Sequence, residues 1–179
     1  MIVSPLQWVK VTSFEPRRSV SVSSAPIVCP EKSVQEAWID YNGHMNMAFY
    51  NLVFDQCLDF VFDELGIGAE YVKTQGGSCF TREIHVNYLA ELSLGDPIRV
   101  TFQLLDWDAK RLHYFEEMYH AGEDYLAATS EQLALHVDMH SRRTAPFPDE
   151  IQSRLAELMK AHRDLAVPEQ VGHVIGIPS

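Results

Sequence analysis

The stretch from residue 48 to residue 65 constrains the fold of this chain more than any other. It holds 12 apolar residues out of 18, and they recur at helical spacing rather than in alternation. A helix that is apolar nearly all round is stable only when other structure wraps it. Asn46 can cap its start and Gly66 can end it. We therefore expect one central helix, covered on most of its faces by the rest of the chain.

Strand patterns dominate the chain after this helix. Apolar residues alternate along four segments that are separated by Gly, Pro and Asp turns: Ser78–Ala90, Ile98–Asp106, Arg111–Ala121 and Tyr125–Met139. The short segment Val34–Ile39, ahead of the helix, is also compatible with a strand. One helix followed by a run of strands predicts an α+β fold with an antiparallel sheet. The edge strands of such a sheet have unpaired backbone N–H and C=O groups. Pairing two edge strands in a dimer satisfies these groups.

The length of 179 residues fits one main domain with a shorter segment at each end. We assign residues 1–25 to an irregular arm, residues 26–148 to the main domain, and residues 149–179 to a C-terminal helix and tail. The helix is predicted over Asp149–His162, and a further short helix over residues 69–75.

Charge and hydropathy exclude several classes of protein. The formal net charge of −11 argues against nucleic-acid binding, which needs Lys and Arg for phosphate, and against an anionic membrane surface. No apolar run has the length of a membrane span, and the start of the chain lacks the pattern of a signal peptide. A few local cations can still bind one anionic ligand, because they outweigh the global field at short range.

The cysteines and histidines do not suggest a metal centre. There are three cysteines, Cys29, Cys57 and Cys79, an odd number without metal-ligand spacing, so we expect neither a disulfide framework nor a zinc site. A reducing cytoplasm fits this usage best. Asp138 and His140 alternate onto one face of a predicted strand, but no third ligand joins them. Five strand histidines are more readily explained as structural: His85, His113, His120, His136 and His140.

The segment from Asp40 to Met47 carries the best candidate chemistry. A carboxylate lies shortly before a long helix, whose first N–H groups are unpaired and sit at the positive end of the helix dipole. Such a terminus can hold an oxyanion while Asp40 attacks a carbonyl or activates water. The competing interpretation makes Asp40 and Asn42 turn residues, Asn46 a cap and His44 a loop residue. The residue pattern alone favours that second interpretation.

A resemblance reverses this balance. Residues 38–50 read WIDYNGHMNMAFY, which resembles the Asp-x-x-Gly-His-x-Asn signature of hotdog-fold thioesterases of the 4-hydroxybenzoyl-CoA thioesterase type. The resemblance extends from Val34 to Pro148 and includes the turn at residues 94–97. Within it, WIDYNGHMN is most similar to the thioesterases of carnitine degradation, which hydrolyse betainyl-CoA.

The resemblance implies a hotdog fold, in which a curved antiparallel sheet wraps a long central helix, and a homodimer or homotetramer with sites at the interface. It implies that Asp40 acts as nucleophile or general base. Met47 falls where the helix start offers its backbone N–H to the thioester oxygen, and His44 and Asn46 shape the loop. Many relatives have Asn where this chain has Met47. A backbone role survives that difference, but a side-chain role does not.

The resemblance gives less direct indications of which residues contact an acyl-CoA substrate. The remaining motif positions Asn42, Gly43 and Tyr50 are expected beside the substrate. Arg142 and Arg143 follow a strand end and are our candidates for the CoA phosphates, ahead of Arg82, Lys110 and Arg111. A trimethylammonium group would need aromatic faces, for which six side chains are available: Trp38, Tyr41, Phe54, Trp107, Tyr114 and Phe115. No cofactor and no metal are expected.

The sequence also allows other catalytic carboxylates and other functions. Asp55, Asp59 and Asp63 form an acidic stripe on the central helix, where another hotdog lineage carries its catalytic acid, although a solvated face is the better explanation. Glu83, Glu116 and Glu117 lie on predicted strands, and the sequence indicates no catalytic partner for any of them. The alternative functions are a hotdog hydratase or dehydratase, which pairs its acid with a histidine at other spacings, and a non-catalytic acyl-CoA-binding protein.

Overall fold

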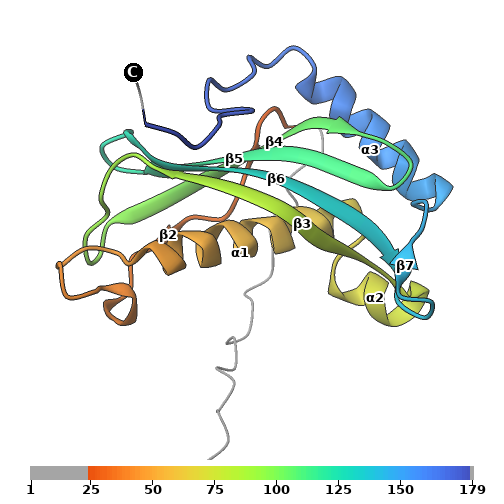
Figure 1. The fold of residues 1–179 in the computed structure, drawn as a ribbon, viewed down its shortest axis with the longest axis horizontal. Helices are drawn as coiled ribbons and strands as arrows, with labels where there is room; N and C mark the ends of the chain where they lie inside the picture. The colour runs from red at the N-terminus through yellow and green to blue at the C-terminus, as the bar shows by residue number, and fades with distance from the viewer. Residues whose placement is uncertain (1–23, 178–179) are drawn as a thin grey trace, which may run out of the picture.

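A long helix lies in the hollow of a curved antiparallel sheet (Figure 1). This computed structural model describes residues 24–177, so nearly all of the arm predicted at residues 1–25 lies outside the described part. The sheet has seven strands in the order β1-β4-β5-β6-β3, with β2 also on β4 and β7 also on β6. The elements are β1 (Ile27–Val28), β2 (Lys32–Ser33), a 3-10 helix (Glu36–Trp38), α1 (Met47–Leu65), α2 (Ala69–Gln75), β3 (Gly77–Tyr88), β4 (Pro97–Trp107), β5 (Arg111–His120), β6 (Leu126–Asp138), β7 (Arg143–Thr144) and α3 (Asp149–His162).

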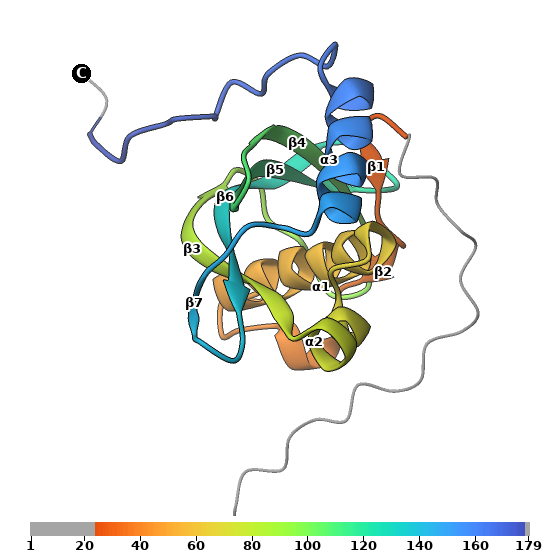
Figure 2. The ribbon, with the colours of Figure 1, turned by 90° about the vertical axis from the view of Figure 1, so that its right-hand side faces the viewer.

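The central helix is built as its sequence predicts. The side chain of Asn46 accepts a hydrogen bond from the N–H of Ala48 at 3.0 Å, and Gly66 ends the helix in the left-handed conformation with φ 79°. Val53, Phe54 and Val61 are fully buried, because the sheet curves over this helix and α2 and α3 contact its C-terminal half. Figure 2 shows α1 enclosed in this way, with α3 beside β4.

The segment before the helix differs from the prediction. Residues 34–39 were expected to form a strand, but Glu36–Trp38 form a turn of 3-10 helix instead. Trp38 is buried and stacks on Phe49 of α1, with ring centroids 5.8 Å apart, and its carbonyl accepts the N–H of Asn46 at 2.9 Å. These contacts with the helix outweigh the weak local preference for a strand.

The cysteine prediction also needs correction. Cys29 and Cys57 form a disulfide, with Cα atoms 5.6 Å apart, and only Cys79 is free. Cys29 follows β1, whose pairing with β4 brings this part of the chain over the middle of α1, where Cys57 lies. The two residues are 28 positions apart, and their spacing alone does not indicate the approach.

One long edge of the sheet has no partner strand within the described residues. It belongs to β3, which pairs only with β6, whereas the opposite edge on β4 is covered by β1, β2 and α3. Apolar side chains are exposed along β3: Phe80 at 39%, Ile84 at 46% and Tyr88 at 43%. An open edge of 12 residues is a ready template for pairing with another chain.

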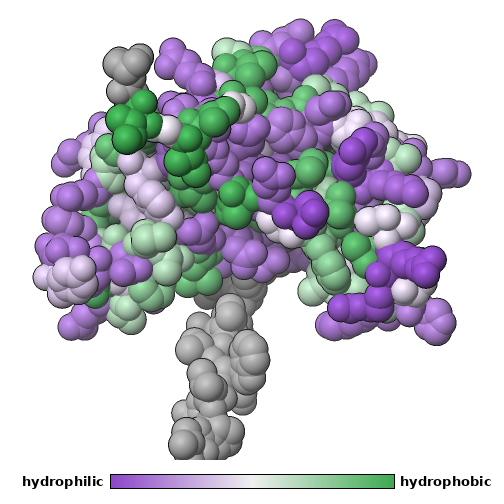
Figure 3. Space-filling view, viewed as in Figure 1, coloured by the Kyte–Doolittle hydropathy of each residue, from purple (hydrophilic) through white to green (hydrophobic). Residues whose placement is uncertain are grey.

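The chain after α3 crosses the outer face of the sheet, away from α1 (Figures 1 and 2). Two hydrogen bonds attach it there, from the Gln103 side chain to the carbonyl of Ala166 and from the N–H of Gly172 to Glu131. Its last described residues are apolar and exposed, as the green atoms next to the C-terminus show (Figure 3). No helix within residues 24–177 is long and apolar enough to cross a membrane.

Candidate active site

The turn that follows Trp38 orients the carboxylate of Asp40. The N–H of Asp40 donates to the carbonyl of His44 at 3.0 Å, and the N–H of Gly43 donates to the carbonyl of Asp40 at 3.0 Å. Gly43 has φ 87°, a left-handed conformation that favours glycine. One carboxylate oxygen, Oδ1, accepts the N–H of Asn42 at 2.7 Å. Local hydrogen bonds therefore hold the half-buried acid, and Asn42 and Gly43 lie on the exposed side of the same turn.

Asn46 connects this acid to the start of α1. Its amide nitrogen lies 3.5 Å from Oδ2 of Asp40, while its amide oxygen accepts the N–H of Ala48. The next residue, Met47, is the first residue of the helix, and its own N–H has no acceptor within the described chain. Its side chain is 62% exposed and contributes little packing. An anchored carboxylate and an open helix N–H thus lie a few residues apart, which is the arrangement needed to attack a carbonyl and hold the developing charge.

His44 connects the turn, and Tyr50 connects α1, to the loop between β3 and β4. Nε2 of His44 lies 2.9 Å from a carboxylate oxygen of Glu91. The Tyr50 hydroxyl donates to the carbonyl of Ala90 at 3.3 Å and accepts the N–H of Leu92 at 3.1 Å. Burial raises the pKa of Tyr50, which keeps the hydroxyl neutral. These contacts are structural. The roles expected for the two side chains toward a substrate remain predictions.

The two arginines lie far from Asp40 within one chain. At one end of β3, Gly77 pairs with Asp138, close to Arg142 in the turn after β6 and to Arg143 at the start of β7. At the other end, the Tyr88 hydroxyl donates to the carbonyl of Met47 at 3.3 Å. The two ends of this 12-residue strand are roughly 35 Å apart at the rise of a β-strand. Arg142 lies over the Phe80 ring, 5.5 Å from its centroid, and Arg143 is exposed.

A cleft of about 390 Å³ opens beside the start of α1, between this helix and β3. Its lining comprises Ala48, Asn51, Leu52, Asp55, Thr81, Ile84 and Gln132. Of the acidic stripe considered above, only Asp55 lines this cleft, and Asp59 and Asp63 are exposed farther along the helix. None of the six aromatic side chains considered for a cationic group is among its lining residues. The sequence does not indicate which residues of the sheet line this cleft, because strand pairing alone brings them next to the helix.

A buried carboxyl group lies behind this cleft. Glu116 is fully buried on β5, and one of its oxygens accepts the side-chain amide of Gln132 at 2.9 Å. Its other oxygen has no hydrogen-bond partner. Gln132 also accepts the hydroxyl of Tyr114 at 3.0 Å and donates to Ser130 at 3.0 Å. Burial raises the pKa of Glu116 well above its usual range, the Gln132 hydrogen bond opposes this, and the charge of Asp55 adds to it.

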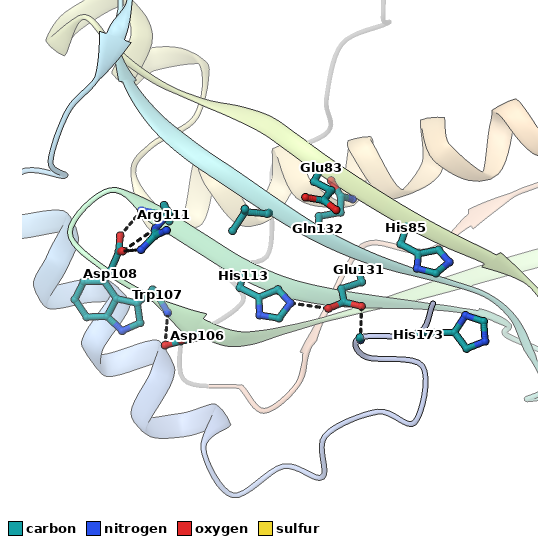
Figure 4. A pocket seen from close by; sticks show the side chains of 12 residues that line it. Glu83, His85, Asp106, Trp107, Asp108, Arg111, His113, Glu131, Gln132 and His173 are labelled. Atoms are coloured by element: carbon teal, nitrogen blue, oxygen red, sulfur yellow. Dashed lines mark hydrogen bonds and ion pairs between the residues drawn. The ribbon is translucent and has the colours of Figure 1, made fainter. Parts of the chain in front are cut away.

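A second cavity, of about 570 Å³, lies on the opposite face of the sheet under the C-terminal segment (Figure 4). Figure 4 shows Glu131 between His113 and the C-terminal segment. His113 lies 2.8 Å from one of its carboxylate oxygens, and the N–H of Gly172 donates to the other at 2.7 Å. The side chain of Arg111 donates to Asp108 at 2.7 Å. Two pairs of charged groups here, His113 with Glu131 and Arg111 with Asp108, are engaged with each other, and the sheet separates them from Asp40.

The described residues contain no group of three His, Cys, Asp or Glu side chains that could hold a metal ion. Asp138 accepts the N–H of Ser141 at 2.6 Å, which makes it a turn residue. His120 accepts the N–H of Glu123 at 2.9 Å, and His136 lies 2.9 Å from the Tyr71 hydroxyl, 65 positions away in the chain.

Comparisons with known proteins identify the family of this chain. The sequence model of the thioesterase-like superfamily matches residues 34–155. The chain is 43% identical over 148 residues to a betainyl-CoA thioesterase of Pseudomonas aeruginosa, covering 83% of this chain and 93% of that protein. It is also 34% identical over 154 residues, 86% of this chain, to a bifunctional L-carnitine dehydrogenase/betainyl-CoA thioesterase of Rhizobium meliloti, of which it spans 31%.

Two solved structures are similar over most of their length. One is a hypothetical protein of Staphylococcus aureus solved in complex with CoA, with TM-score 0.81, 33% identity, and coverage of 87% of this chain and 98% of that one. The other is a putative thioesterase of Pseudomonas putida, with TM-score 0.75, 35% identity, and coverage of 87% and 99%. The family match spans the Asp40 turn, α1 and the sheet, and the fold is the one that the motif implied. This chain therefore belongs to the thioesterase-like superfamily of hotdog-fold proteins.

Proposed function

We propose that this chain hydrolyses an acyl-CoA thioester, with Asp40 as the catalytic carboxylate and the Met47 N–H as the oxyanion donor. The observation that carries the proposal is the pairing of an anchored acid with an open helix start. Asp40 accepts the N–H of Asn42 and contacts Asn46, whose amide caps the helix at Ala48. No cofactor is needed, because a thioester needs only a nucleophile, a site for charge and a leaving thiol.

Two courses of the reaction fit this geometry. Asp40 attacks the carbonyl carbon, the thiolate of CoA leaves, and water then hydrolyses the resulting anhydride. Alternatively, Asp40 takes a proton from a water molecule that attacks the carbonyl directly. In both courses negative charge develops on the thioester oxygen, and the N–H of Met47 and the dipole of α1 stabilise it.

The relatives suggest betainyl-CoA as the substrate. The 43% identity to the Pseudomonas aeruginosa enzyme extends over 83% of this chain. A panel of betainyl-CoA, benzoyl-CoA and hexanoyl-CoA, followed by release of free thiol, tests the proposal. We expect hydrolysis with betainyl-CoA as the best substrate. Thiol release from none of them would overturn the thioesterase, and hydration of an enoyl-CoA instead would favour a hydratase. The cytoplasmic location expected from the sequence stays a prediction.

A second copy of the chain completes the site in this proposal. The open edge of β3 and the exposed side chains of Phe80, Ile84 and Tyr88 favour pairing of two β3 strands. An antiparallel, two-fold arrangement lays the Gly77 end of one β3 beside the Tyr88 end of the other. Arg142 and Arg143 of one copy then approach the Asp40 turn of the other, where their charge is available to the phosphates of CoA.

We therefore expect the protein to be at least a dimer at micromolar concentration. Multi-angle light scattering should give a mass of at least twice the 20.4 kDa of one chain. On dilution, turnover per chain should fall when the dimer dissociates, since the arginines that serve one Asp40 come from the other copy. A monomer with full turnover would contradict the shared site and leave the catalytic role of Asp40 standing.

A further inference from the structure

Asp55 is the only charged residue among those that line the cleft between α1 and β3. The cleft begins at Ala48, next to the Met47 N–H, so an acyl group whose carbonyl oxygen accepts this N–H can extend into it. The seven residues from Ala48 to Asp55 span about 10 Å of helix, and helical side chains lean toward the N-terminus. The carboxylate of Asp55 is therefore close enough for an electrostatic interaction with a charge at the end of a short acyl group.

The rest of the lining bears on which kind of cation the cleft can bind. Leu52 and Ile84 offer methyl groups, and both are exposed to the cleft. The side-chain amide of Gln132 is occupied by Tyr114, Glu116 and Ser130, so it is not available to an incoming N–H. A quaternary ammonium has no N–H to donate and needs only apolar contact and a nearby negative charge. Apolar contact from Leu52 and Ile84, together with the charge of Asp55, meets this requirement.

The buried carboxyl of Glu116 does not supply the charge. It is fully buried, one oxygen has no partner, and burial and the nearby charge of Asp55 raise its pKa well above the usual range. Burial therefore favours the uncharged form of this carboxyl, which lies behind Gln132 in the floor of the cleft. The negative charge that faces the acyl group comes from Asp55, which is exposed to solvent.

We propose that Asp55 determines acyl-group specificity by selecting a quaternary ammonium acyl group in the cleft between α1 and β3. This deepens the proposed function and rests on it. Asp55 binds the acyl group and takes no part in bond making, so its charge affects the cationic substrate and not a neutral substrate of the same shape.

The test compares betainyl-CoA with its neutral isostere, 3,3-dimethylbutanoyl-CoA, in which a tert-butyl group replaces trimethylammonium. In the wild type, kcat/KM should favour betainyl-CoA by at least tenfold, about 1.4 kcal/mol of differential binding. Asp55→Asn should lower kcat/KM for betainyl-CoA by about tenfold and change that of the isostere by less than twofold. Asp59→Asn, one turn farther along the exposed stripe, removes the same charge outside the cleft and should leave both values unchanged.

Glu116→Gln should retain the preference for betainyl-CoA, because Glu116 is not among the residues that line the cleft and burial favours its uncharged form. An equal loss for both substrates in Asp55→Asn would overturn the specificity role and point to a catalytic or structural one. A wild type without preference for the cationic substrate would overturn the inference and leave the thioesterase standing. Failure of the wild type to hydrolyse either substrate or the panel thioesters would instead overturn the proposed function and the inference with it.

Discussion

Asp40→Asn is expected to lower kcat by about 10² or more, the scale of a lost nucleophile or general base. The amide oxygen of Asn can still accept the N–H of Asn42, so the turn should keep its shape. What it loses is the negative charge and the basic lone pair that both courses of the reaction require. Release of CoA thiol at saturating betainyl-CoA measures kcat, and thermal unfolding checks that the fold is retained.

Asp108→Asn is the matched control for this change. Oδ1 of Asp108 accepts the N–H of Lys110 at 2.8 Å, two residues on, as Oδ1 of Asp40 accepts the N–H of Asn42. Asp108 lies in the turn between β4 and β5, on the other side of the sheet, so its replacement should leave kcat within about twofold. Wild-type kcat in Asp40→Asn would remove the catalytic role from this residue.

Met47→Pro should also lower kcat by about 10² to 10³, the usual effect of losing one oxyanion donor. Proline has no N–H, and the first position of a helix is the one place where a helix tolerates it, since that N–H has no partner within the helix. The preceding residue must be extended before proline, and Asn46 already has φ −64° and ψ 142°. The variant therefore removes a single donor while α1 can still form.

Met47→Ala separates the backbone from the side chain. The methionine side chain is 62% exposed, so alanine should keep kcat near that of the wild type and retain the helix. Circular dichroism should give the same helix content for both variants. If proline at this position leaves kcat unchanged in a folded protein, another group holds the oxyanion. If alanine is as damaging as proline, the side chain matters and the backbone assignment is wrong.

Most of the secondary-structure elements and the turn at Asp40 could be predicted from the sequence. All-round apolar spacing predicted α1, whose caps at Asn46 and Gly66 are confirmed, and alternation predicted the four long strands to within a few residues. Asp149–His162 was confirmed as a helix with the predicted bounds. The superfamily and the hotdog fold followed from the residues around Asp40. These properties depend on neighbours within one or two turns of chain, so the order of residues carries them directly.

Contacts between residues that are far apart in the chain could be read only from the folded structure. Strand pairing placed Gln132 and Ile84 opposite α1, so that Asp55 lines a cleft that Asp59 and Asp63 do not line, and it brought Cys29 to Cys57. Packing on Phe49 turned the segment at Trp38 into a 3-10 helix, and the length of β3 set Arg142 far from Asp40 in one chain. The physical reason is that a local pattern fixes the period of a segment but not its register or its partner. Those depend on burial summed over contacts between residues that are far apart in the chain.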